Sequence, residues 1–136
     1  KGKFMTFALC NGTNPYIVTL NYGYDRENKV IYMHCADHGM KIDYIQNNPN
    51  ACATMIENHG YKVRECSQFY RSLVIWGKLS LVTELEEKKH AFSILFKHLE
   101  GENQEMVKQM ASDEEAYLGV GVLRFDIDEI DAKGNV

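Results

Sequence analysis

Basic residues are fewer than acidic residues in this chain. Its 136 residues include 15 Lys and Arg against 19 Asp and Glu, which gives a formal net charge of −4. Nonspecific nucleic-acid binding needs a basic field that neutralises phosphates, so this balance argues against a nucleic-acid partner. An anionic ligand would have to be captured by a local site.

Long apolar runs are missing as well. No stretch approaches the roughly 18 apolar residues that a membrane-spanning helix needs, and no signal peptide is visible. We therefore expect no membrane partner. The length suffices for one domain with its own core, and no repeat, linker or low-complexity segment divides it. We expect a single domain over residues 1–136.

Paired cysteine motifs are absent too. No C-x-x-C spacing occurs among the four cysteines, Cys10, Cys35, Cys52 and Cys66. A chain of this size builds a core without disulfides, so reduced and mostly buried thiols are the simplest interpretation, which indicates a cytoplasmic protein. His34 and His38 are four residues apart, but we expect a strand-to-turn boundary between them and hence no metal site.

Strand-forming sequence, by contrast, is abundant. Apolar or alternating runs bounded by turn residues predict six strands, at 4–10, 16–24, 29–35, 50–56, 69–82 and 118–130. Short turns at 11–15 and 25–28 make the first three strands an antiparallel meander. The polar segment 57–68 is expected to be a loop or a long hairpin connection. Gly77, inside the fifth strand, predicts a bulge or a close approach.

Helices are predicted between these strands. One covers 37–47, with Asp37 as its N-cap and Pro49 as a stop signal. A second covers 83–99 and opens with a capping box formed by Thr83 and Glu86. The segment 102–111 is a candidate for a third. Six strands with two or three inserted helices predict a mainly β fold, a closed or nearly closed antiparallel barrel with helical covers.

The segment 34–43 carries the strongest functional signal, because it ends an apolar strand and opens a helix. A helix N-terminus has partial positive charge and exposed N–H groups, so His38 and Lys41 are electrostatically unfavourable in its first turn. An anion held between the N–H groups and Lys41 would turn that cost into a binding site, and a phosphate suits it. The alternative is that Lys41 is a solvated surface lysine.

The order of these pieces resembles a known family. The strand after Pro15, the block 30–36, the run 39–43, Asn48-Pro49 and the strand 72–79 are similar, in this order, to the FMN-binding split-barrel family. This is the pyridoxamine 5′-phosphate oxidase-like superfamily, and the nearest branch holds nitroimidazole-resistance-type flavoproteins. The resemblance covers nearly the whole chain. It implies a six-stranded antiparallel split barrel that forms a homodimer, with FMN at the interface in contact with both subunits.

The resemblance also implies which residues bind FMN. Backbone groups of the second strand would line the flavin ring, here Thr19, Leu20 and Asn21. The end of the third strand and the helix start would hold the phosphate, here His34, Cys35, Ala36, Met40 and Lys41. The strand that starts at Ser72 would approach the ring from the partner subunit. Candidates for an apolar strand face that the dimer covers are Leu73, Ile75 and Leu79.

The function implied is that of a small FMN-dependent oxidoreductase. Reduced nicotinamide would donate electrons to the flavin, which would pass them to a small acceptor such as a nitroaromatic, a quinone or another flavin. We assign no catalytic residue, because the cofactor carries the redox step. The alternatives are a non-enzymatic flavin-binding electron carrier and a haem-binding split-barrel protein, with His34 or His38 as the haem ligand.

The C-terminal part departs from the family pattern. Pyridoxamine phosphate oxidases carry basic residues there for the substrate phosphate, whereas this chain has an acidic tail in which only Arg124 is basic nearby. We therefore do not expect oxidation of pyridoxamine phosphate.

Overall fold

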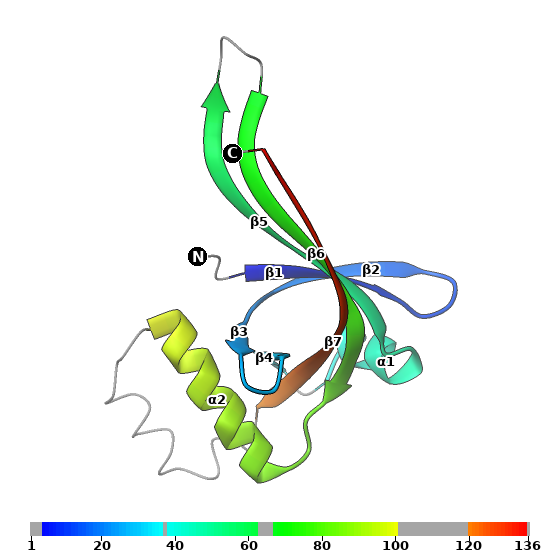
Figure 1. Ribbon diagram of the computed structural model, residues 1–136. Helices are drawn as coiled ribbons and strands as arrows, with labels where there is room; N and C mark the ends of the chain where they lie inside the picture. Colours follow the sequence, from blue (N-terminus) through cyan, green and yellow to red (C-terminus); the bar gives the residue numbers. More distant parts are fainter. Residues whose placement is uncertain (1–3, 37, 63–66, 101–119, 136) are drawn as a thin grey trace.

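The fold is a single curled antiparallel sheet with two helices. The structure is a computed structural model that describes residues 4–36, 38–62, 67–100 and 120–135. Seven strands within these ranges follow the order β2-β1-β5-β6-β7-β4-β3 and form a half-barrel (Figure 1). The elements are β1 (Phe4–Cys10), β2 (Pro15–Asn21), β3 (Gly23–Asp25), β4 (Val30–Cys35), α1 (Met40–Asn47), β5 (Asn50–Lys62), β6 (Ser67–Leu81), α2 (Leu85–Glu100) and β7 (Gly121–Asn135). The mainly β antiparallel fold is confirmed, with seven strands in place of six.

The additional strand arises because the run 16–24 is interrupted at Tyr22. The strands on its two sides, β2 and β3, lie at opposite edges of the sheet. The predicted meander is therefore wrong, although the hairpins β1–β2 and β3–β4 both form. Tyr22 is 4% exposed, and its hydroxyl donates to Sδ of Met55 over 2.6 Å. Its side chain is thus anchored in the core where the chain leaves one edge for the other.

Most of the polar segment 57–68 is strand rather than loop. β5 continues to Lys62 and β6 begins at Ser67, and the two pair along their length with one register shift near Asn58 and Gly60. Figure 1 shows this hairpin projecting beyond the rest of the half-barrel, with the end of β7 beside it. Strands outside a core need no apolar alternation, which explains why periodicity did not reveal them.

Gly77 lies at a bulge, as predicted. Trp76 pairs with Glu129 and Gly77 pairs with Ile127, so β7 carries one extra residue, Asp128, between these pairs. A Cβ atom on Gly77 would collide with the carbonyl oxygen of Asp126. Only glycine therefore allows β6 and β7 to approach this closely here.

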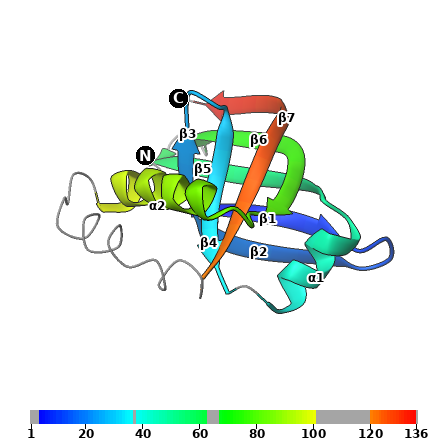
Figure 2. The same cartoon turned by 90° about the horizontal axis from the view of Figure 1, so that it is seen from below.

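The core consists of two apolar clusters on the two sides of β4. Ile31 and Met33 face the inside of the curled sheet, where Phe7 and Phe125 meet edge to face at 5.2 Å. Val30 and Tyr32 face the outside, where α2 packs on them through Ala91, Phe92 and Leu95. Alternation along β4 thus places one helix on the outer surface of the sheet (Figure 2).

The apolar strand face predicted for the dimer is wrong in its residues. Ile75 and Leu79 are each 2% exposed inside the inner cluster, and Leu73 packs against that cluster. Side chains alternate along β6, so Val74 and Trp76 are the ones on the outer surface.

Both long helices are present, with shifted starts. α1 begins at Met40 with Gly39 as its N-cap, so the predicted cap at Asp37 is wrong, and Asp37 itself lies outside the described residues. In α2 the first helical hydrogen bond runs from the Lys88 N–H to the Glu84 carbonyl, one residue beyond the predicted cap. The predicted helix at 102–111 and the strand start at 118–119 also lie outside the described residues.

No helix in the described ranges is both long and apolar enough to cross a membrane.

Candidate functional site

The N-terminus of α1 is the most promising anion site in the described chain. Gly39 adopts a φ of 119°, has open space around it, and provides no side-chain cap. The first internal hydrogen bond runs from the Asp43 N–H to the Gly39 carbonyl over 3.1 Å, so the N–H groups of the three preceding residues have no acceptor within the helix. Lys41 is half-buried at the second helical position. Three N–H donors and one ammonium group are what a phosphate needs.

The end of β4 places two predicted phosphate contacts on opposite faces of the sheet. His34 faces α2, and its ring lies 6.2 Å from that of Phe92 at an angle of 32°. Cys35 packs against the inner cluster. Their side chains therefore do not line one pocket, and a shared role with exposed Ala36 would be through the backbone.

The three residues of β2 that were predicted to line the flavin ring also lie on opposite faces of the sheet. Thr19 and Asn21 are on the outer surface of β2, and Leu20 packs against the inner cluster. The hydroxyl of Thr19 lies 3.0 Å from that of Thr6 on β1. Ser72 is also on the outer surface, on β6, opposite Ile56 of β5. The ring contacts that share a surface are thus Thr19, Asn21 and Ser72.

On the outer surface of β2, β1, β5 and β6 lies an area of apolar and uncharged polar side chains that we call the open face. It is bordered by Lys78, which pairs with Asn50 on the same surface. In the orientation of Figure 2, α2 covers the neighbouring outer surface over β4 and β3 rather than this one. Its largest exposed side chains are Phe4, Ile17, Ile56 and Trp76, at 60%, 67%, 66% and 40% exposure. We define the open face by twelve of the residues that the register of the four strands places on this surface, Phe4, Thr6, Ala8, Ile17, Thr19, Asn21, Cys52, Thr54, Ile56, Ser72, Val74 and Trp76.

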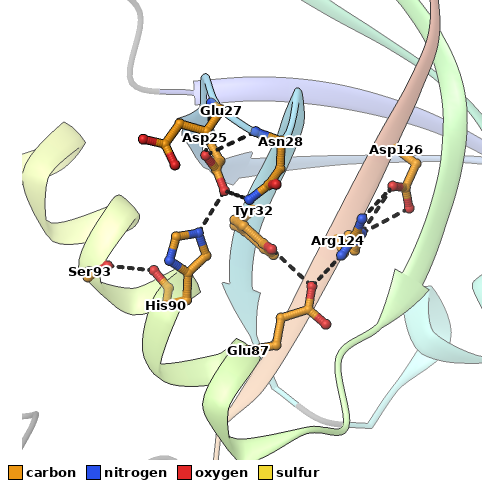
Figure 3. Close-up of polar contacts among 9 residues, drawn as sticks. All are labelled: Asp25, Glu27, Asn28, Tyr32, Glu87, His90, Ser93, Arg124 and Asp126. Carbon is orange, nitrogen blue, oxygen red and sulfur yellow. Dashed lines mark hydrogen bonds and ion pairs between the residues drawn. The ribbon is translucent and has the colours of Figure 1, made fainter.

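A polar network that the sequence did not predict anchors α2 (Figure 3). Asp25 is 3% exposed and accepts hydrogen bonds from the Glu27 and Asn28 N–H groups, from Asn28 Nδ2 at 2.7 Å and from His90 Nε2 at 2.6 Å. The bond from His90 is the main cause that lowers the pKa of Asp25, against the opposing effect of burial. The carboxylate therefore stays charged and ties α2 to the β3–β4 turn.

A second carboxylate extends this network to β7. Glu87 Oε2 accepts from the Tyr32 hydroxyl at 2.9 Å and from Arg124 at 2.6 Å, and Arg124 also donates to Asp126 at 3.0 Å. Burial, and then the bond to Glu87, raises the pKa of Tyr32 to about 12. The two carboxylates raise the pKa of Arg124, so its guanidinium is already engaged. Glu87 and His90 lie three residues apart on one face of α2, but this spacing alone does not indicate their partners, which are distant in the sequence.

Metal ligands do not gather in the described part of the chain, where no three His, Cys, Asp or Glu side chains are grouped around a common point. Cys10, Cys35 and Cys52 form no disulfide among the described residues.

Comparison with known proteins identifies the class to which this fold belongs. The family model for pyridoxamine 5′-phosphate oxidase matches residues 1–134. The chain therefore belongs to this family. No curated protein sequence is significantly similar to it.

Solved structures share the fold over nearly the whole chain. A candidate 5-nitroimidazole antibiotic resistance protein from Bacteroides thetaiotaomicron is 26% identical with a TM-score of 0.82, over 97% of this chain and 76% of that one. An FAD-binding protein from Mesorhizobium loti is 19% identical with a TM-score of 0.69, over 99% and 88%. An FAD and haem binding protein from Mycobacterium smegmatis is 14% identical with a TM-score of 0.76, over 98% and 65%. At such low identity the last two demonstrate a common fold alone.

Proposed function

We propose that the chain is an FMN-binding oxidoreductase that passes electrons from reduced nicotinamide, through the flavin, to a small acceptor such as a nitroaromatic or a quinone. The observation that carries this proposal is the start of α1, where Gly39 provides no side-chain cap for the first N–H groups and Lys41 is the second helical residue, a combination that suits a phosphate. Membership of the pyridoxamine 5′-phosphate oxidase family and the likeness to the candidate resistance protein support it.

The chain's own residues would bind and orient the cofactor. Lys41 and the N–H groups of the first turn hold the phosphate, and backbone groups around Thr19 and Asn21 position the ring on the outer surface of β2. The bound flavin supplies the redox chemistry, since it accepts and donates electrons itself. No side chain of the described region is required as a general acid or base.

The open face supports a homodimer with flavin at its interface. In the sheet, β1 and β5 lie between β2 and β6, so Asn21 and Ser72 of one chain are separated by three strand spacings, roughly 14 Å. One chain therefore does not bring both residues to the same part of a ring. A second copy docked on the open face would supply its own Ser72 and would cover the exposed apolar side chains.

Oxidation of pyridoxamine phosphate is not part of the proposal. Arg124, the basic residue at the first part of β7, is held by Glu87 and Asp126 and has little capacity left for a substrate phosphate. An acceptor without a phosphate group suits this arrangement better.

Absorbance and reduction experiments test the proposal. The purified protein, loaded with FMN, should show flavin absorbance near ~450 nm, and anaerobic NADH or NADPH should bleach it. Bleaching followed by reoxidation with a nitroaromatic or quinone supports an enzyme, and binding without bleaching supports the electron carrier instead. A Soret band would identify the haem-binding alternative. Failure of the protein to take up FMN at all would refute the proposal.

A further inference from the structure

We infer that Asn11, which Gly12 follows in the loop between β1 and β2, is a site of intramolecular deamidation that converts it to aspartate and isoaspartate. The loop brings together a side-chain amide, a backbone nitrogen that attacks it and a sulfur that accepts the proton. This is the single Asn-Gly pair in the sequence. The site is independent of the proposed flavin site.

The reaction needs water and no other co-reactant. The Gly12 nitrogen attacks Cγ of Asn11, and the new N–C bond closes a succinimide ring. The side-chain amide leaves as ammonia and takes the proton that the attacking nitrogen has lost. Water then opens the ring at one of its two carbonyls, which gives aspartate or isoaspartate, and nothing is oxidised or reduced. Glycine suits the attacking position because it has no Cβ beside the nitrogen.

Three donors surround Oδ1 of Asn11. This oxygen accepts from the Thr13 N–H at 3.1 Å, from the Thr13 hydroxyl at 3.2 Å and from the Asn14 N–H at 2.8 Å. Negative charge develops on this oxygen as the nitrogen attacks, and donors already in place stabilise it in the way that an oxyanion hole does. The ring closed by the Thr13 N–H bond contains both Cγ of Asn11 and the nitrogen of Gly12, so one tight turn holds the two reacting atoms.

The attacking nitrogen has an acceptor for its proton. The Gly12 N–H donates to Sγ of Cys10 at 3.4 Å, which is the contact that a proton transfer to sulfur requires. Gly12 has a φ of 107°, and no atom lies within 4 Å of the place that a Cβ would take. Cys10 and Gly12 are both exposed, so water reaches the ring that has to be opened.

The two products differ in their effect on α1. Aspartate offers the same oxygen to the three donors, so the turn accommodates it. Isoaspartate adds the side-chain carbon to the main chain and displaces the Asn11 carbonyl, which accepts from Asn47 Nδ2 at 2.8 Å. Asn47 is the last residue of α1, and Figure 2 shows the helix beside this loop. Isoaspartate therefore breaks the bond that ties the end of α1 to the loop.

Peptide mapping by mass spectrometry tests the site during incubation of the purified protein in mildly alkaline buffer. Asn11 should gain the mass that replacement of NH₂ by OH produces, at least as fast as in a synthetic peptide of residues 8–16, and isoaspartyl methyltransferase should label the isoaspartate product. Asn14 and Asn48 should keep their amides, because each precedes a proline, whose nitrogen carries no hydrogen. An Asn11 that keeps its amide while the peptide reacts would overturn the inference.

Three variants separate the folded site from the dipeptide alone. Gly12→Ala should slow the reaction at least about tenfold, because the added Cβ displaces the attacking nitrogen. Thr13→Val removes a donor and Cys10→Ala removes the proton acceptor, so each should slow it about fivefold, less than the roughly 10²-fold effect of a buried oxyanion-hole donor because the loop is exposed. Thr83→Val, at an exposed position before α2, should keep the wild-type rate. Wild-type rates in both Thr13→Val and Cys10→Ala would overturn the inference.

Discussion

His90 Nε2 lies 2.6 Å from Oδ2 of Asp25 and joins α2 to the turn between β3 and β4. Asp25→Asn removes a buried charge that four donor groups surround, so we expect a loss of about 2 kcal/mol in the free energy of unfolding at pH 7. Urea denaturation measures it. Glu27→Asn, which leaves the exposed turn and its backbone bond in place, should stay close to the wild type.

The hydrogen bond between His90 and Asp25 also predicts how the free energy of unfolding changes at low pH. Folding lowers the pKa of Asp25 below its ordinary value of 3.8, so the folded state favours the ionised carboxylate. The resulting stability is present above pH 3.8 and is lost as the pH falls through the lowered pKa. Wild type and Asp25→Asn should therefore converge in urea midpoint in strong acid. A difference as large in strong acid as at pH 7 would contradict this account.

Tyr32 predicts the opposite pH behaviour. Its pKa is raised to about 12 from 10, so the neutral phenol is favoured by folding, and its contribution is present below pH 10 and lost as the pH rises toward 12. Tyr32→Phe should cost about 1 kcal/mol at pH 7 through the lost bond to Glu87. Ultraviolet titration of tyrosinate should show one group fewer titrating late in the variant than in the wild type.

Alanine substitutions at Gly77 and Gly12 compare the stability cost of a steric clash with that of a positive φ angle. Gly77→Ala forces a Cβ against the Asp126 carbonyl, so we expect a loss of about 3 kcal/mol or failure to fold. Gly12 has a φ of 107° but open space around it, so Gly12→Ala should cost only about 1 kcal/mol. A Gly77→Ala protein as stable as Gly12→Ala would show that the bulge is placed wrongly.

The proposed phosphate contact of Lys41 predicts that loss of its side chain weakens FMN binding. Lys41→Ala should weaken FMN binding by about 1.5–3 kcal/mol, the scale of a hydrogen bond between charged groups. Fluorescence titration of FMN measures the change. Lys97→Ala, an exposed lysine on α2, removes the same charge elsewhere and should leave the affinity as it is.

The open face predicts the oligomeric state. Ile17→Asp places a charge on this face, where Ile17 is 67% exposed, and we expect it to convert a dimer into a monomer. Tyr24→Asp introduces the same charge on β3, outside the open face, and should remain dimeric. Light scattering distinguishes the two. A wild-type monomer at micromolar concentration would count against the shared site.

The parts of the fold that depend on local sequence were predictable. The apolar runs of β1 and β4 and the amphipathic pattern of α2 appear in the structure close to their predicted bounds, and Gly77 marks its bulge. The break at Tyr22 and the long pairing of β5 with β6 were missed. Both depend on contacts with distant residues, such as Met55 for Tyr22, which periodicity cannot show.

In the candidate site, too, features with local sequence signals were predictable and features that depend on distant contacts were not. The presence of a helix after β4 could be predicted from local signals, although its start was predicted at Asp37 and its N-cap is Gly39. The division of His34 from Cys35, and of Thr19 from Leu20, follows from strand alternation and could have been anticipated. The link between Asp25 and His90 could not, since 65 residues separate them. The open face also required the strand order, which no local pattern contains.

The most direct test of the phosphate site at α1 compares FMN with riboflavin, which has the same ring and no phosphate. In calorimetric titration of the apo-protein we expect saturation at one FMN per chain and an affinity for riboflavin lower by at least about tenfold, because the N–H groups and Lys41 then have no anion to bind. Equal affinity for the two compounds would contradict the account.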